Sequence, residues 1–383
     1  MGQLTTAETA AEIGRINTFY PLLPKLGTRW ARSRPWEDMC VAVNAHVTSL
    51  TAILIRELAL GGGRWVVSAA NAATTDGNVV NYLREQGVAV YTEGGLADRH
   101  LSALDHDPVL LADVGFELTG TLLDQRREQV RDIKGAVEIT RTGISRLRKR
   151  SHMPFGVVNI NDGELKPRIE NRHGVGEGLW DAIRDLTGMH LAGRRVAVIG
   201  YGAVGQGLAA YGRAAGAVVE VVEIDAIKRL VAHYDGFPTP DLDEALSRVA
   251  IAVTATGRPG AVPLDALQRA RSGLVLVNAG HGGDEIAVSR LPEVADEAVV
   301  IGRHCKRYKL PAGPWLTVLA DGHPLNIVLN AGSPEPVLLH FAVLGLTLEW
   351  LTKNNLSPGE VQVPASIERE AAKLALEALG GGR

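Results

Sequence analysis

The stretch Gly193–Asp225, GRRVAVIGYGAVGQGLAAYGRAAGAVVEVVEID, decides the fold of the second half of the chain. A short apolar run, Val196–Ile199, leads directly into Gly200-Tyr-Gly202-Ala-Val-Gly205. An alanine-rich helical segment follows, and a second apolar run ends at Glu223. Strand, glycine turn, helix, strand and acid in this order predict a Rossmann-type unit that binds a dinucleotide.

Each glycine of this turn has its own physical role. The first makes the tight turn, the second lets a pyrophosphate approach the backbone, and the third lets helix and strand pack closely. The helix N-terminus adds free N–H groups and a positive dipole end for the phosphates. Glu223, eighteen positions after Gly205, is placed to accept hydrogen bonds from a ribose diol and to repel a 2′-phosphate. We therefore expect NAD rather than NADP; the alternative is a glycine turn without a ligand.

Composition indicates an ordinary globular protein of two or three domains, with 383 residues, 46% of them hydrophobic and 22% charged. A net charge of -3 gives no reason to expect binding to nucleic acid or to a membrane. Cys40 and Cys305 are isolated, which favours a reducing compartment without disulfides. The polar N-terminus does not resemble a signal peptide, and no apolar run has the length of a membrane span. We expect a cytoplasmic protein.

Short apolar segments alternate with helical ones before the glycine turn and again after it, which predicts an α/β fold. The expected architecture is two Rossmann-like parallel-sheet domains, with the site in a cleft between them. We expect a substrate domain over residues 1–172 and 325–356, an NAD-binding domain over residues 173–324, and a C-terminal helix with a short tail over residues 357–383.

Helical spacing of apolar residues predicts one helix over Val41–Leu60, with His46 inside it. A lone histidine in such a helix is more often a core residue than a ligand. Asp113 ends a predicted strand, where a helix N-cap and a ligand contact are both open interpretations. A long apolar helix over Pro336–Trp350 is expected to pack on the first domain.

The other polar candidates form a group before the cofactor unit, with two further histidines after it: Lys166, Glu170, Asn171, His281 and His323. Taken singly, each is compatible with a surface residue. An NAD site accompanied by a lysine, two carboxylates and three histidines is suited to oxidation of an alcohol followed by proton transfer.

The order of these motifs resembles that of the S-adenosylhomocysteine hydrolases over nearly the whole chain. The matching segments are Ala45-His46-Val-Thr48, Gly135-Ala-Val-Glu138-Ile-Thr140-Arg-Thr142-Gly143, Asn159-Ile-Asn161-Asp162, Lys166-Pro-Arg-Ile-Glu170-Asn171, the glycine turn, Glu223-Ile-Asp225, Asn278-Ala-Gly-His281 and Gly322-His323-Pro324. The resemblance implies a redox-assisted elimination. Tightly held NAD⁺ oxidises the 3′-carbon of a nucleoside, the ketone acidifies C4′–H, and loss of that proton expels the 5′ substituent. In the hydrolases water then adds to the 4′,5′-alkene before the ketone is reduced.

The resemblance also implies roles for individual residues. Lys166 and Asn171 would support 3′-oxidation and proton removal, and Glu170 replaces an aspartate of the family. The implied catalytic residues are Lys166, Glu170, Asn171, His46, Asp113 and His281, the last three at the 5′ position; the implied substrate contacts are Thr48, Leu50, Ile139, Asn161 and His323. The implied cofactor contacts are Thr140, Arg141, Thr142, Asn171, Gly200, Gly202, Ala203, Val204, Gly205, Glu223, Ile224, Asp225, Lys228, Thr256, Gly257, Gly280, His281 and Thr317. No metal site is expected.

Departures from the family pattern fall on substrate contacts. Leu50 stands where the family has an adenine-contacting Glu or Gln, Ile139 where it has a glutamate for the ribose diol, and Arg141 where it has a threonine. Losing such a carboxylate would cost a ribose substrate at least ~1.5–3 kcal/mol. The family's long tail, which reaches the NAD of a neighbouring protomer, has no counterpart in this sequence. We expect less secure NAD retention and a homodimer or homotetramer.

Three interpretations remain open at this point. The first is a nucleoside dehydratase that leaves an exocyclic alkene, as needed for an angustmycin-type nucleoside. The second is a hydrolase of S-adenosylhomocysteine or of a base variant. The third is a non-catalytic protein that binds NAD and a nucleoside.

Overall fold

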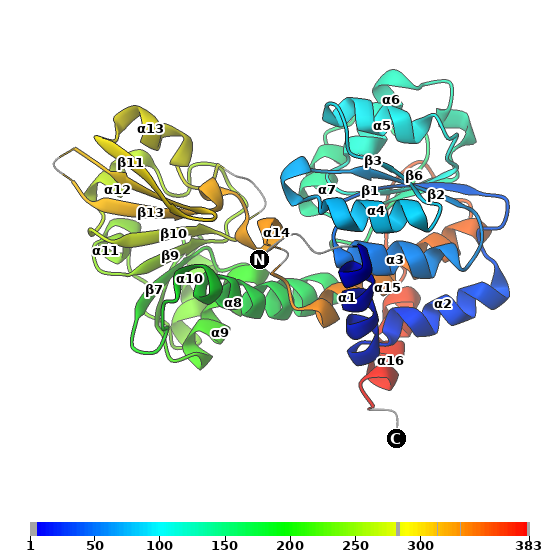
Figure 1. Ribbon diagram of the computed structural model, residues 1–383. Coiled ribbons are helices and arrows are strands. Elements are labelled where there is room, and N and C mark those ends of the chain that lie inside the picture. The colour runs from blue at the N-terminus through cyan, green and yellow to red at the C-terminus, as the bar shows by residue number, and fades with distance from the viewer. Residues whose placement is uncertain (1–5, 281–283, 312, 330, 381–383) are drawn as a thin grey trace. The chain divides into compact units, whose positions relative to one another are not determined.

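The computed structural model describes residues 6–280, 284–311, 313–329 and 331–380, and it divides into two compact units. Unit 1 comprises Met1–Pro167 and Pro334–Arg383, and unit 2 comprises Arg168–Ser333. Each unit contains one seven-stranded sheet (Figure 1). A separate apolar core lies on each face of each sheet. The expected α/β fold with two Rossmann-like sheets is confirmed.

The sheet of unit 1 is entirely parallel, in the order β14-β6-β5-β4-β1-β2-β3. Its strands are β1 Cys40–Ala45, β2 Arg64–Ala69, β3 Ala89–Tyr91, β4 Leu110–Asp113, β5 Gly135–Glu138, β6 Gly156–Asn159 and β14 Gly359–Gln362. Its helices are α1 Thr6–Phe19, α2 Leu22–Ser33, α3 Ser49–Ala59, α4 Gly77–Glu85, α5 Leu96–Leu104, α6 Glu117–Gln125, α7 Arg141–Leu147, α15 Pro334–Lys353 and α16 Ala365–Ala378, with 3₁₀ turns at Ala72–Thr74 and Val130–Asp132.

The helix expected over Val41–Leu60 is wrong, because its first part is strand β1 and only its second part is helix α3. Every residue of β1 is buried, so its side chains show no alternation that would distinguish a strand from a buried helix. Helix α3 begins after Thr48, whose Oγ1 accepts a hydrogen bond from Thr51 N. His46 therefore lies in the loop at the carboxyl end of β1 and not within a helix.

Two further segments of unit 1 differ from expectation. Helix α2 was not predicted, and it accommodates Pro24 in its first turn, where no intrahelical N–H partner is needed. Strand β14 pairs with β6, so the segment after residue 357 extends the sheet of unit 1. The long apolar helix α15 packs against α2, α3 and β5 of this unit, which agrees with the sequence prediction.

Unit 2 has the strand order β11-β12-β13-β10-β9-β7-β8. Its strands are β7 Arg195–Ile199, β8 Val218–Val222, β9 Ile251–Thr254, β10 Leu274–Asn278, β11 Glu297–Gly302, β12 Cys305–Lys309 and β13 Trp315–Leu319. Its helices are α8 Gly176–Thr187, α9 Ala203–Ala214, α10 Ala226–Tyr234, α11 Leu242–Leu246, α12 Leu264–Arg269, α13 Leu291–Val294 and α14 Leu325–Val328, with 3₁₀ turns at Val288–Arg290 and Ala320–Gly322. A π-helix, Lys166–Val175, spans the boundary between the units.

Strands β7, β8, β9, β10 and β13 are parallel, whereas β11 and β12 add an antiparallel edge. The sequence did not predict this edge. Strand β12, CKRYK, is mostly charged, and β11 is exposed along its whole length, so neither contains the apolar run of a buried parallel strand.

Candidate functional site

The strand order of unit 1 reverses between β1 and β4, which are neighbours in the sheet although β2 and β3 lie between them in sequence. In open parallel sheets, ligands bind outside the carboxyl ends of the strands at this switch point. The loops that follow β1, β4, β5 and β6 begin at this edge. They contain the predicted site residues His46, Thr48, Ile139, Thr140 and Asn161, and β4 ends in Asp113. The structure thus gathers candidates spread over more than a hundred residues.

A row of buried polar side chains crosses the sheet just below this edge. Asn44, Asp113, Glu138 and Asn159 lie at or near the ends of β1, β4, β5 and β6, and each is at most 1% exposed. Asp113 pairs with Glu138 in the register of β4 and β5, and Glu138 pairs with Asn159 in that of β5 and β6. Only Asp113 among them was predicted as a site residue. The signal for the others was a polar residue ending an otherwise apolar strand.

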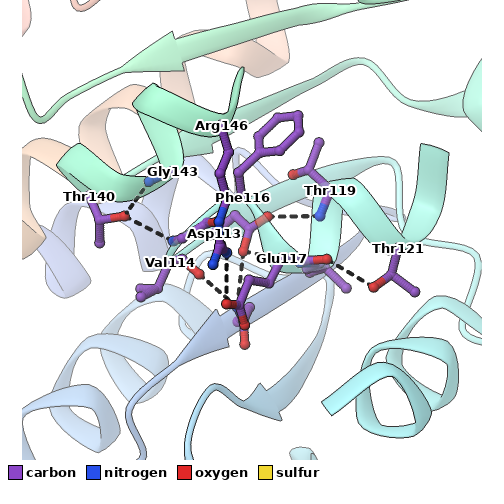
Figure 2. Close-up of polar contacts among 12 residues, drawn as sticks. Asp113, Val114, Phe116, Glu117, Thr119, Thr121, Thr140, Gly143 and Arg146 are labelled. Carbon is purple, nitrogen blue, oxygen red and sulfur yellow. Dashed lines mark hydrogen bonds and ion pairs between the residues drawn. The ribbon is translucent and has the colours of Figure 1, made fainter. Parts of the chain in front are cut away.

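Asp113 anchors the start of α6 (Figure 2). Its Oδ2 accepts a hydrogen bond from Thr119 N at 2.7 Å, and its Oδ1 accepts from Leu118 N at 3.3 Å and from Asn44 Nδ2 at 3.0 Å. Burial raises the pKa of Asp113, while the hydrogen bonds from Thr119 and Asn44 act in the opposite direction. The N-cap residue of α6 is Phe116, but the buried Asp113 carboxylate accepts from main-chain N–H groups in the first turn of this helix, which is the task of a capping side chain.

Glu138 ties two loops of the edge together. Its carboxylate accepts hydrogen bonds from Gly115 N at 3.1 Å and Phe116 N at 2.7 Å, and from both N and Oγ1 of Thr140 at 2.7 Å. Burial, together with the nearby charge of Asp113, raises the pKa of Glu138 to about 8. A methyl group at Gly143 would collide with this carboxyl group, so the close packing here requires glycine.

His46 is fixed through both its ring and its main chain. Its Nδ1 lies 2.7 Å from Thr74 Oγ1, which belongs to the 3₁₀ turn after β2. Its carbonyl oxygen accepts hydrogen bonds from Thr51 Oγ1 at 2.5 Å and from Thr48 N at 3.1 Å. A half-buried, oriented imidazole at a strand end is chemically able to take part in proton transfer.

The predicted substrate positions Leu50 and Ile139 are apolar and almost fully buried, at 4% and 7% exposed. Both belong to the same core cluster, and the half-buried Val114 packs against that cluster. Position 139, directly after β5, therefore presents a packed aliphatic side chain and no carboxylate for a ribose diol.

Lys166, Glu170 and Asn171 lie in the π-helix, a segment for which the sequence predicted no regular structure. With i to i+5 hydrogen bonding, residues four and five positions apart share one face, so these three side chains can act together. All three are half-buried. A π-helical segment is often found at a functional site.

The other two predicted substrate contacts lie in loops. Asn161 follows β6 and donates to Asp162 Oδ1 at 2.7 Å through its side-chain amide. His323 is exposed and follows Gly322, whose φ of +80° is in the left-handed region.

In unit 2 the three glycines of the turn have distinct surroundings. Gly200 has a φ of +102°, and a Cβ there would come within 2.8 Å of Ala255 O. A Cβ at Gly205 would collide with Gly200 O, whereas a Cβ at Gly202 would meet nothing within 4 Å. Gly202 thus borders open space at the N-terminus of α9, next to Ala203 and Val204, where phosphates can approach. The residues present fit NAD.

The acid at the end of β8 is held in place by backbone groups on both sides. Glu223 accepts a hydrogen bond from Tyr201 N at 2.7 Å and one from Asp225 N at 2.9 Å. Asp225 caps α10 by accepting from Ile227 N and Lys228 N, both at 3.0 Å. Asp225 thus has a structural task besides any contact with the cofactor.

The remaining predicted cofactor residues lie in several separate segments. Thr256 and Gly257 donate main-chain hydrogen bonds to the buried carboxylate of Glu285, and Gly280 N donates to Asn278 Oδ1. Ile224 is 84% exposed. Thr140 caps α7, whose first residues are Arg141 and Thr142. Thr317 lies in the middle of β13, paired with Arg307, and not at a strand end. His281 lies outside the described residues.

The comparisons with known proteins agree with this geometry. Residues 171–332 match the family model of the S-adenosyl-L-homocysteine hydrolase NAD-binding domain. The chain is 33% identical over 390 residues to an adenosylhomocysteinase from Pyrobaculum aerophilum, an alignment that covers 94% of this chain and 89% of the relative. The chain belongs to the adenosylhomocysteinase family.

A second relative of this adenosylhomocysteinase-family protein has a different name. It is an S-inosyl-L-homocysteine hydrolase from Methanopyrus kandleri, 31% identical, with 94% of this chain and 88% of the relative aligned. Among solved structures, a dipicolinate synthase chain from Bacillus halodurans is similar with a TM-score of 0.51 and 13% identity, covering 83% of this chain and 99% of that one. At that identity the likeness supports the fold alone.

The adenosylhomocysteinase-family chain takes NAD as its cofactor, as the match of its second unit to the NAD-binding domain shows. Within the described ranges, no helix is long and apolar enough to cross a membrane. The same residues contain no group of three or more His, Cys, Asp or Glu side chains that could hold a metal ion.

Proposed function

We propose that this protein is a nucleoside dehydratase that removes water from a hydroxymethyl group at C4′ of a purine nucleoside and leaves an exocyclic 4′,5′-alkene, as in angustmycin-type biosynthesis. The observation that carries the proposal is the contrast at the edge of unit 1. The apolar Leu50 and Ile139 are packed into the core where the family pattern has polar recognition, while His46 and Lys166 remain.

The bound cofactor would supply reversible oxidation at C3′, which makes the C4′ proton acidic. Lys166 and Asn171, on one face of the π-helix, would hold the 3′-oxygen, and the neutral amine of Lys166 would receive the C4′ proton. As that proton leaves, its bonding electron pair forms the C4′=C5′ bond and the C5′–O bond breaks. His46 would donate a proton to the departing oxygen, so that water is released and the net reaction involves no change of oxidation state.

A direct experiment compares two substrates under the same conditions. The enzyme is incubated with an adenine nucleoside of a ketohexose and, separately, with S-adenosylhomocysteine, and the products are followed by mass spectrometry. We expect loss of one water from the first and slow or no turnover of the second. Rapid release of homocysteine, without any dehydrated product from the ketohexose nucleoside, would contradict the proposal.

The second candidate is a hydrolase of S-adenosylhomocysteine or of a variant with another base. One relative is named S-inosyl-L-homocysteine hydrolase, a name that specifies a base other than adenine. The similarity to this relative favours a hydrolase that acts on such a base variant. The S-adenosylhomocysteine arm of the experiment, repeated with the inosyl compound, separates the two candidates.

A protein that binds NAD and a nucleoside without catalysis is the third candidate. Lys166→Ala should abolish turnover and leave NAD affinity unchanged if the protein is an enzyme, since Gly202 and Glu223 belong to a different segment. Binding of both ligands, with no product from the wild type, would favour this third candidate. We also propose a cytoplasmic homodimer or homotetramer, which light scattering coupled to gel filtration would measure.

A further inference from the structure

Thr74 makes two contacts through a single hydroxyl group. Its Oγ1 lies 2.7 Å from His46 Nδ1 and 3.0 Å from the carbonyl oxygen of Asn71. The residue is 8% exposed, so these contacts lie mostly within the protein. Neither Thr74 nor its 3₁₀ turn was a predicted part of the site.

Only one arrangement of hydrogens makes both contacts hydrogen bonds at the same time. A carbonyl oxygen can only accept, so the one hydrogen of the Thr74 hydroxyl points to Asn71. Toward His46 the hydroxyl oxygen must then accept, which requires a hydrogen on Nδ1. In the neutral imidazole the other nitrogen, Nε2, consequently carries the basic lone pair.

We infer that Thr74 is a positioning residue that holds His46 in its Nδ1–H tautomer and thereby makes Nε2 the nitrogen that gains and loses the proton. The tautomer rests on both contacts of the Thr74 hydroxyl being hydrogen bonds, whereas the use of Nε2 in proton transfer rests on the proposed function. Thr74 and the Asn71 carbonyl take the place of the third group that orients the histidine of a catalytic triad.

The chain around Thr74 holds this arrangement together. Asp76 N donates to Val47 O at 3.0 Å, and Ala70 N donates to Ala45 O at 3.0 Å, so the segment after β2 is tied to the main chain on both sides of His46. The hydroxyl oxygen of Thr74 is an uncharged acceptor, so it can accept from the His46 ring in both charge states of the ring. Nδ1 keeps its hydrogen in the imidazole and in the imidazolium, so the hydrogen bond to Thr74 persists while the proton moves at Nε2.

The first test reads the tautomer directly. The full-length protein is labelled with ¹⁵N-histidine, long-range ¹H–¹⁵N correlation spectra distinguish the two tautomers, and the His46 signals are assigned with His46→Gln. We expect the Nδ1–H form in the wild type, a shift toward Nε2–H in Thr74→Val, and the Nδ1–H form again in Thr74→Ser. An Nε2–H ring in the wild type, or an unchanged tautomer in Thr74→Val, would overturn the inference.

Thr75→Val is the matched control. The Thr75 hydroxyl donates to the same Asn71 carbonyl at 2.8 Å, so this variant removes a neighbouring hydrogen bond of the same kind. The His46 tautomer should not change in it. Equal tautomer shifts in Thr75→Val and Thr74→Val would overturn the inference, because the effect would then come from the turn and not from the contact with Nδ1.

The second test measures turnover of the nucleoside substrate. Thr74→Val should lower kcat by at least ~10-fold, a part of the ~10²–10⁴-fold that a positioned acid–base group contributes, while KM stays within ~2-fold of the wild type. Thr74→Ser should restore kcat. If the NMR results are as expected but the wild type dehydrates no nucleoside, the proposed function fails and the role of Thr74 stands. If the dehydratase is active and Thr74→Val leaves both kcat and the tautomer unchanged, the inference fails by itself.

Discussion

Two alanine substitutions in the glycine turn should have different effects, one on the affinity for NAD and the other on the stability of the fold. At Gly202 the backbone has φ −79° and ψ −169°, an extended conformation that alanine adopts readily, and the added methyl group would meet nothing within 4 Å. Alanine is a poorer N-cap than glycine but restricts the unfolded chain, and these opposing effects leave the free energy of unfolding within ~1 kcal/mol of the wild type.

The methyl group of Gly202→Ala occupies the space through which a pyrophosphate reaches the α9 N-terminus. Loss of one hydrogen bond to a charged phosphate costs ~1.5–3 kcal/mol. Because each 1.4 kcal/mol corresponds to about tenfold in affinity, the Kd for NAD should rise by ~10–150-fold. Isothermal titration calorimetry on cofactor-free protein would measure this change, and urea unfolding would measure stability.

Gly205→Ala should behave differently, since its methyl group collides with the main-chain oxygen of Gly200. The backbone must move, at a cost of ~1–3 kcal/mol or more in the free energy of unfolding. Gly14→Ala, in α1, is the matched control because its Cβ meets nothing within 4 Å, and it should leave the affinity for NAD unchanged. Wild-type affinity for NAD in Gly202→Ala, or unaltered stability in Gly205→Ala, would refute the reasoning.

Three other predictions concern the acid after β8 and the buried polar groups of unit 1. Glu223→Ala should weaken NAD binding and reduce the preference for NAD over NADP, measured by titrating both cofactors; unchanged discrimination would mean that the carboxylate does not meet the ribose. Gly143→Ala should destabilise unit 1, because the added methyl group collides with Glu138. Thermal unfolding would measure this, and an unfolding temperature equal to that of the wild type would contradict the prediction. Burial lowers the pKa of His100 from 6.5 to about 4. The contribution of the neutral imidazole to the free energy of unfolding is therefore fully present above pH 6.5 and is lost as the pH falls toward 4. This loss amounts to about 3 kcal/mol of unfolding free energy. His100→Gln should remove that pH dependence from urea unfolding curves, and a slope equal to that of the wild type would count against it.

The cofactor unit could be predicted because all its determinants lie within one short stretch of chain. Gly200, Gly202 and Gly205 act through the local backbone, and Glu223 follows one helix and one strand later, so their spacing determines their geometry. The resemblance to the family extended the predicted site to polar residues that follow other strands. These relations hold for any chain that forms the βαβ unit, which explains the agreement of sequence and structure here.

Only the tertiary structure decided what the polar residues of unit 1 contact. Asp113 and Glu138 are neighbours because β4 pairs with β5, and this pairing, together with α6, turns Asp113 toward the protein interior. His46 meets Thr74, 28 positions further along the chain, because β1 and β2 are parallel partners whose following loops meet at the same edge. A buried strand such as β1 also shows no periodicity that separates it from a helix. Such contacts depend on which strands lie side by side, a property of the assembled sheet that no single stretch of sequence contains.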